Sequence, residues 1–117
     1  MDEATQDAVR LFREGMVEHA EQMEMIREIK DQWANHAKHV ISVFLTAPGK
    51  AKVRVKSPVS GTVSVVRVKI GPLHNWAALR KGNIQALIPE LGENDRELLL
   101  TGYTAEDWFT LFGDGEG

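Results

Sequence analysis

Residues Ala51 to Ile70, AKVRVKSPVSGTVSVVRVKI, decide the fold of this chain of 117 residues. Two valine-rich runs alternate apolar with charged or polar residues, which is the pattern of β-strands with one buried face. The loop residues 57–61 lie between the runs, so the stretch predicts an antiparallel hairpin. The alternation changes parity at Val65 and Val66, which predicts a β-bulge. Antiparallel pairing would place five basic residues on one solvent face: Lys52, Arg54, Lys56, Arg67 and Lys69.

Charge is distributed in three blocks around this hairpin. Residues 1–49 contain nine acidic and five basic residues, and residues 50–88 contain eight basic and no acidic residues. Residues 89–117 contain eight acidic residues and one basic residue. The net charges of the blocks are −4, +8 and −7, within an overall charge of −3. A basic centre between two acidic ends predicts charge-dependent contacts with partners.

Residues 3–45 are predicted to form one long helix or two nearly continuous ones, because apolar residues recur in a heptad-like, coiled-coil seam. Such a helix is roughly 65 Å long at about 1.5 Å per residue, which exceeds the width of the remaining chain. We therefore expect a homo-oligomer or a partner contact through the seam. The alternative is a helix that breaks near Gly15 or His36 and folds back. The seam residues are Phe12, Met16, Met23, Ile26 and Trp33.

The fold class predicted for the whole chain is α+β. A long helical arm over residues 1–49 precedes a small α+β domain over residues 50–117, which ends in an acidic tail. Proline and glycine divide the part after the hairpin into short segments. The elements expected there are a helix over 76–81, a third antiparallel strand over 83–88 and two helices over 96–101 and 105–112.

The last of these helices carries more apolar side chains than so short a segment can leave in water. Thr104 and Asp107 have the spacing of a capping box and mark its start. We expect its aromatic residues, Trp108, Phe109 and Phe112, to dock onto this protein or onto a larger partner.

No arrangement of residues points to catalysis. The chain has no nucleophile with a base at motif spacing, no glycine-rich phosphate loop and no metalloprotease signature. It contains no cysteine, which excludes disulfides and thiolate metal sites. His36 and His39 are spaced to share a metal on a helix, but no obvious third ligand accompanies them. We expect a non-enzymatic protein with no catalytic residues, no cofactor and no metal.

Two segments resemble known families. The first, NDRELLLTGYTAEDWFTLFG from Asn94 to Gly113, resembles the ends of many small phage-encoded accessory and assembly proteins. The second, VKSPVSGTVSVVRVKIG from Val55 to Gly71, resembles half of a lipoyl or biotinyl carrier domain. The modified lysine of that carrier family has no counterpart here. The first resemblance implies a phage or prophage origin and points to Arg96, Gly102, Thr104, Trp108 and Phe112.

No apolar run reaches the roughly 18 residues of a membrane span, and the polar, acidic start MDEATQDAV is unlike a signal peptide. We therefore expect no membrane contact and a location in the host cytoplasm or in a virion.

The leading functional hypothesis is a phage accessory or virion-assembly protein that oligomerises through its N-terminal helix. It would bind a larger phage or host protein through its C-terminal helix, and nucleic acid or an acidic surface through the basic hairpin. One alternative is an inhibitor of a host enzyme or defence complex, with acidic arms that imitate nucleic acid. Another is a small dedicated nucleic-acid-binding protein that contacts phosphates. Two further interpretations of the hairpin charge stay open: a basic edge that only prevents aggregation, and a face that receives the acidic tail of this chain or of a neighbour.

Overall fold

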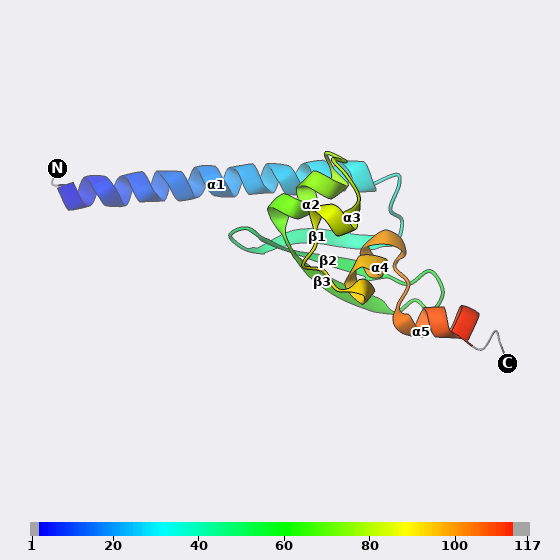
Figure 1. The fold of residues 1–117 in the computed structure, drawn as a ribbon. Helices are drawn as coiled ribbons and strands as arrows, with labels where there is room; N and C mark the ends of the chain where they lie inside the picture. Colours follow the sequence, from blue (N-terminus) through cyan, green and yellow to red (C-terminus); the bar gives the residue numbers. More distant parts are fainter. Residues whose placement is uncertain (1–2, 114–117) are drawn as a thin grey trace.

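A three-stranded antiparallel sheet in the order β1-β2-β3 lies at the centre of the fold (Figure 1). The computed structural model describes residues 3–113, with the side chains of Gln6 and of residues 15–113. Helices and a single sheet confirm the predicted α+β class. The elements are α1 (Glu3–Trp33), β1 (Val40–Ala47), β2 (Lys50–Lys56), β3 (Val63–Lys69), α2 (Ile70–Ala77), α3 (Ile84–Leu87), α4 (Glu93–Thr101), α5 (Ala105–Trp108) and the π-helical turn η1 (Phe109–Gly113).

The predicted hairpin is formed by β2 and β3, and its pairing is more regular than expected. Val53 pairs with Val66, and the neighbouring residues pair in turn without a register shift. Val65 is 38% exposed whereas Val66 is fully buried, so the two valines lie on opposite faces of an unbroken strand. The predicted bulge is therefore wrong, because it assumed that both valines face the core.

The strand β1 replaces the end of the predicted long helix. Helix α1 continues through Gly15 and ends at Trp33, and residues 40–47 pair with β2. A two-residue turn at Pro48 and Gly49 joins the strands, and Gly49 has φ +76°, as a Pro-Gly type II turn requires. The run at 40–47 is rich in β-branched residues, which pack well in strands. The prediction of a helix over 3–45 is thus wrong beyond Trp33, and residues 40–47 belong to the sheet and not to a helical arm.

Two elements after the hairpin also differ from the prediction. Helix α2 begins at Ile70, because Pro72 lies in its first turn, where a proline costs no helical hydrogen bond. Residues 84–87 form helix α3 and not a strand, and Asn83 caps it by accepting a hydrogen bond from the Ala86 N–H at 2.8 Å. The expected third strand exists, but it is β1.

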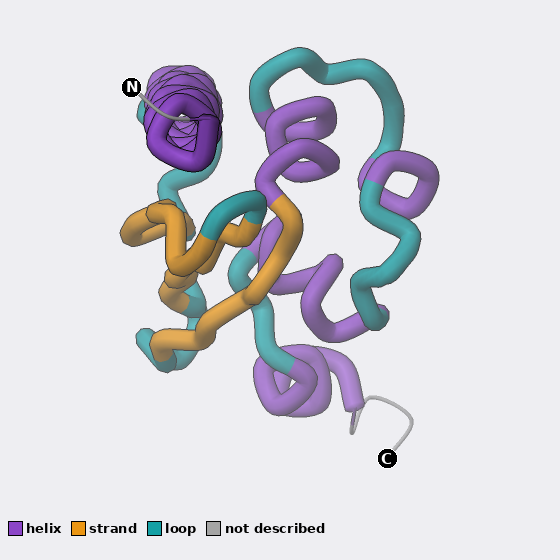
Figure 2. Tube along the Cα trace, turned by 90° about the vertical axis from the view of Figure 1, so that its left-hand side faces the viewer, coloured by secondary structure: helices purple, strands orange, loops and turns teal. Residues whose placement is uncertain are grey.

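One face of the sheet packs against the helices and forms the core. Figure 2, with α1 seen end-on, shows α1 above one edge of the sheet and the later helices together on one side. Val53, Val55 and Val66 from the sheet are fully buried, and Ile26 and Ile29 from α1 join the same cluster. Burial of each such side chain stabilises the fold by about 1.5–3 kcal/mol.

Helix α1 extends well beyond this core. Residues 15–21 are all exposed, and the first buried side chain of the described part is Gln22, whose Oε1 accepts a hydrogen bond from the Gly49 N–H at 2.8 Å. The molecule is consequently elongated, with extents of 76 × 26 × 25 Å. Within residues 3–113, none of the helices combines the length and the apolar character that a bilayer span needs.

Candidate functional site

The outward face of the sheet gathers basic side chains from two strands. Cross-strand pairing places Lys52 beside Arg67 and Lys50 beside Lys69. The period of two along β2 keeps the other basic residues of that strand on the same side. The register thus brings together all five basic residues singled out from the sequence and adds Lys50. The basic face consists of Lys50, Lys52, Arg54, Lys56, Arg67 and Lys69.

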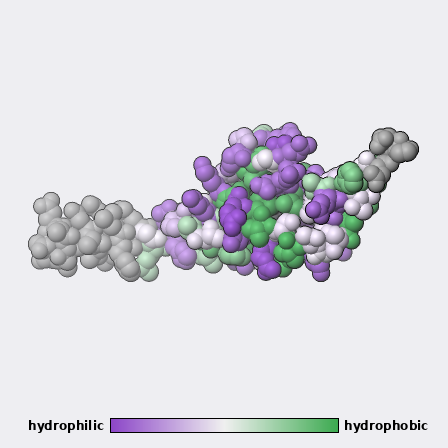
Figure 3. Space-filling model, turned by 90° about the horizontal axis from the view of Figure 1, so that it is seen from below, coloured by the Kyte–Doolittle hydropathy of each residue, from purple (hydrophilic) through white to green (hydrophobic). Residues whose placement is uncertain are grey.

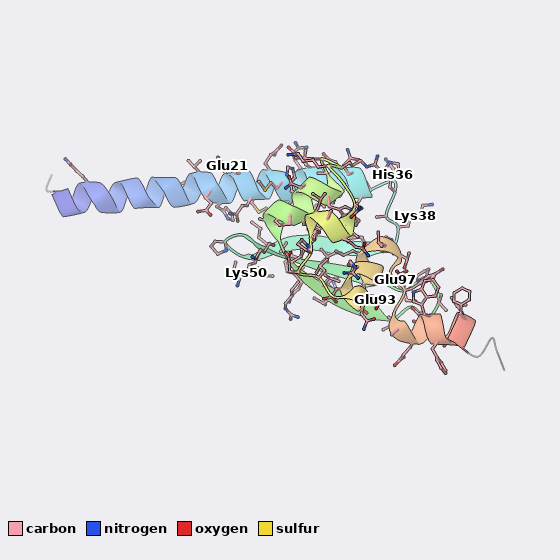
Figure 4. All side chains as sticks on the ribbon, in the orientation of Figure 1. Glu21, His36, Lys38, Lys50, Glu93 and Glu97 are labelled. Atoms are coloured by element: carbon pink, nitrogen blue, oxygen red, sulfur yellow. The ribbon has the colours of Figure 1, made fainter. Side chains whose placement is uncertain are left out.

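No acidic side chain of the sheet opposes this charge, since residues 40–69 contain no Asp or Glu. The ion pairs among the described side chains all lie on helices, not on the sheet. Figure 4 shows Lys50 at the free end of the β1–β2 hairpin, whereas Glu93 and Glu97 project from α4. An uncompensated set of like charges creates a positive potential that attracts anionic partners. The ion pairs are Arg27–Glu24 and Arg27–Asp31, and the His74 ring also hydrogen-bonds to Glu28.

An aromatic ring lies at the edge of the basic face. Phe44 on β1 is the cross-strand partner of Lys52, and its ring centroid lies 6.0 Å from the Lys52 Nζ, at the limit of a cation–π contact. The ring is 41% exposed. Phe44, Lys52 and Arg67 form a row across the three strands. The sequence prediction missed Phe44 because it assigned the residue to a helix, although the β-branched residues around Phe44 were a signal for a strand.

Apolar side chains extend the surface around this ring. Val63 and Val65 of β3 pair with Lys56 and Arg54 of β2 on the outward side, and both valines are exposed. Figure 3, seen from below, shows hydrophobic residues at the surface in the middle of the body and again toward the C-terminal end, with hydrophilic residues around them. The face can therefore contact both charged and apolar groups of a ligand.

A single buried carboxylate fastens the C-terminal segment to the sheet. Asp107 accepts hydrogen bonds from the Ser57 hydroxyl at 2.6 Å and from the Thr104 N–H at 2.8 Å. The Asp107 N–H donates to the Thr104 Oγ1 at 3.0 Å, which completes the predicted capping box. The Ser57 hydrogen bond, followed by that from the Thr104 backbone, lowers the pKa of Asp107 below its ordinary value.

The aromatic residues that follow this anchor remain exposed. Trp108 contacts Phe112, with ring centroids 4.9 Å apart, and meets Tyr103 edge-on at 5.5 Å. Even so, Trp108 is 40%, Phe109 61% and Phe112 60% exposed. These three residues, predicted to dock, are not covered by the described part of their own chain.

The structure places the residues of the predicted oligomer seam in two different environments. Met16 and Met23 are exposed, whereas Ile26 is 2% exposed and belongs to the core. Trp33 packs edge-on against a tryptophan of α2, with ring centroids 6.3 Å apart. The assignment of Ile26 to an intermolecular seam is therefore wrong, because this side chain packs within its own molecule, whereas Trp33 is only partly buried by this contact. Phe12 lies outside the described side chains.

The two histidines of the connection between α1 and β1 are not brought together with other ligands. The His39 Nε2–H donates to the Leu99 carbonyl oxygen at 2.7 Å, and His36 is exposed. In the described part of the chain, no group of three or more His, Cys, Asp or Glu residues could hold a metal ion.

No protein-family model, curated protein or solved structure matches this chain. The resemblances to phage accessory proteins and to carrier domains therefore stay predictions. The basic face and the exposed C-terminal aromatic residues are the two surfaces on which a function can be argued.

Proposed function

We propose that this chain is a non-enzymatic protein that binds single-stranded nucleic acid through the open face of its sheet. The observation that carries the proposal is an exposed ring, Phe44, at the edge of six basic residues that have no acidic neighbour on the sheet. Lysine and arginine attract phosphates by charge, and an exposed aromatic ring can stack on a base. A basic edge that only prevents aggregation requires no such ring.

The row of Phe44, Lys52 and Arg67 supports a single strand as the ligand. In a duplex the faces of the bases are stacked inside the helix, whereas a single strand can place a base on Phe44 and its phosphates beside the basic residues. The outward residues of β2 and β3 are lysine, arginine and valine. Because contacts to phosphates and stacking on a ring do not depend on the identity of the base, we expect weak sequence preference.

This proposal joins two of the hypotheses drawn from the sequence. It takes nucleic acid as the functional ligand of the basic face. The accessory role in a phage remains a proposal that depends on the resemblance of residues 94–113.

The proposal is tested by fluorescence anisotropy with a labelled oligothymidylate of about 16 nucleotides, the upper site size of comparable single-strand binders. In the double variant Lys52→Ala/Arg67→Ala, the slope of log affinity against log salt should fall by about 1.4, because each phosphate contact on a single strand contributes about 0.7. Phe44→Ala should weaken binding about 5- to 150-fold, as expected for loss of one stacked base.

The matched control is Lys38→Ala/Lys81→Ala, which removes the same charge from exposed positions outside the sheet. It should retain most of the affinity. Equal losses in the control and in Lys52→Ala/Arg67→Ala would mean that the net charge of the molecule, not the sheet, determines binding. No binding of the wild-type protein at low salt would remove the proposal.

A further inference from the structure

We infer that the C-terminal segment of one copy docks onto the basic face of a second copy and competes there with nucleic acid. The docking segment is defined as residues 104–113. The competition rests on the proposed function, whereas the self-association stands on the two surfaces alone.

The charges of the two surfaces are complementary. Within the docking segment Glu106 is exposed and Asp107 is buried, and the preceding residues 89–103 add four acidic residues and one basic residue, of which Glu90 and Glu93 are exposed. The sequence that follows adds Asp114 and Glu116. The basic face carries six cations and no anion. Opposite potentials of this kind steer association and fix the orientation of the partners.

The apolar parts of the two surfaces are complementary as well. The docking segment exposes Trp108, Phe109 and Phe112, together with Leu111. The basic face offers the exposed ring of Phe44 and two valines of β3. Aromatic side chains surrounded by charged ones are the usual composition of an interface centre and its rim. Aromatic rings also bind lysine and arginine through cation–π contacts, so the same segment can use both components of the face.

The docking segment does not reach the basic face of its own molecule. The hydrogen bond from Ser57 to Asp107 holds the start of α5 at the loop between β2 and β3. Figure 1 shows α5 beyond that end of the sheet, pointing away from the strands. Both Phe44 and Phe109 remain exposed in the single chain. The basic face can therefore receive this segment only from a separate copy.

A contact between two different surfaces is heterologous, and it repeats from copy to copy unless a ring closes. Every subunit would then have its basic face covered except the one at the end of the row. Nucleic acid that occupies this face would displace the docking segment, so binding and self-association should oppose each other.

The test is sedimentation velocity of the full chain at low salt over a range of protein concentrations, without nucleic acid. The average mass should rise above the 13.1 kDa of the single chain. Phe109→Ala/Phe112→Ala and Lys52→Glu/Arg67→Glu should each be monomeric, since each lacks one half of the contact. A mixture of these two variants should form one-to-one dimers and nothing larger, because only one intact pair of surfaces remains. Met16→Ala/Met23→Ala, the control for pairing through α1, should associate like the wild type.

Several results would overturn the inference while leaving the nucleic-acid proposal intact. These are a wild-type protein that is monomeric at every concentration, and association that is lost in Met16→Ala/Met23→Ala but kept in Phe109→Ala/Phe112→Ala. A monomeric wild-type protein that binds a larger protein through residues 104–113 would also overturn the inference, because the partner of the segment would then be that larger protein. Added oligothymidylate should reduce the assemblies to monomers. Assemblies that bind it and persist would show that the two ligands do not compete.

Discussion

Asp107 joins two parts of the chain that are 50 residues apart, through its hydrogen bond from Ser57. The hydrogen bonds favour the ionised carboxylate in the folded protein and so lower its pKa. The stabilisation that follows is complete above the ordinary pKa of 3.8 and is lost as the pH falls through the lowered pKa of the folded state.

We expect the docking segment to detach in acid before the core unfolds. The indole resonance of Trp108 should shift as the pH falls below 3.8, while those of Trp33 and Trp76 stay unchanged. In Asp107→Ala the Trp108 resonance should already be in its acid position at neutral pH. A variant that keeps the wild-type acid response would show that Asp107 is not the anchor. Nuclear magnetic resonance of the three indoles provides the measurement.

Gly102 ends α4 in the left-handed conformation, with φ +82°. A Cβ at this position would lie 2.9 Å from both the His39 Cβ and the Lys56 carbonyl oxygen. Gly49 has a similar φ of +76°, but nothing lies within 4 Å of its Cβ position. Alanine at either site costs roughly 1–2 kcal/mol for the left-handed backbone.

Gly102→Ala should therefore destabilise the protein by about 1–3 kcal/mol more than Gly49→Ala, because only Gly102 adds overpacking. Urea denaturation of both variants measures this difference. Equal losses of stability would mean that the neighbours of Gly102 move aside freely.

At the scale of elements, one part of α1 packs into the core and another part is exposed. Ile29→Ala should lower the free energy of unfolding by about 2–5 kcal/mol, because the side chain is fully buried. Met16→Ala, on the same helix but 58% exposed, should change it by no more than about 0.5 kcal/mol. Denaturation in dilute solution compares the two. A large loss in Met16→Ala would place this part of α1 in a contact that the single chain does not make.

The β2–β3 hairpin could be predicted from sequence because its valines alternate with charges that cannot be buried. The end of α1 was predicted only as an alternative, a break near His36, since residues 34–39 contain no glycine or proline to mark it. The apolar run of β1 is compatible with either a buried strand or a helix, and its pairing with β2 settles the choice through contacts that are distant in sequence. The basic face was therefore predicted without Phe44.

The exposed docking segment could be predicted from its excess of aromatic residues alone. By contrast, the part of the α1 stripe around Ile26 has the same helical spacing as an oligomer seam. Only the position of the sheet shows that this part is core.

At the scale of the whole molecule, the radius of gyration of 18.2 Å exceeds the roughly 13 Å of a compact chain of this length. Small-angle scattering from Phe109→Ala/Phe112→Ala, which we expect to be monomeric, should give a maximum dimension near 76 Å. A symmetric, compact distance distribution would mean that α1 folds back onto the body in solution.

The helix that inserts Ile26 and Ile29 into the core is the same unbroken rod that leaves it toward the N-terminus. A flexible linker would limit only the distance between the body of the protein and an attachment point, whereas a rigid helix also fixes the orientation of the body. A partner that binds α1 would thereby fix the orientation of Phe44 and of the basic residues beside it. Copies held side by side through their α1 helices would present their sheets in the same direction. A nucleic-acid strand bound across these sheets would then follow one defined path.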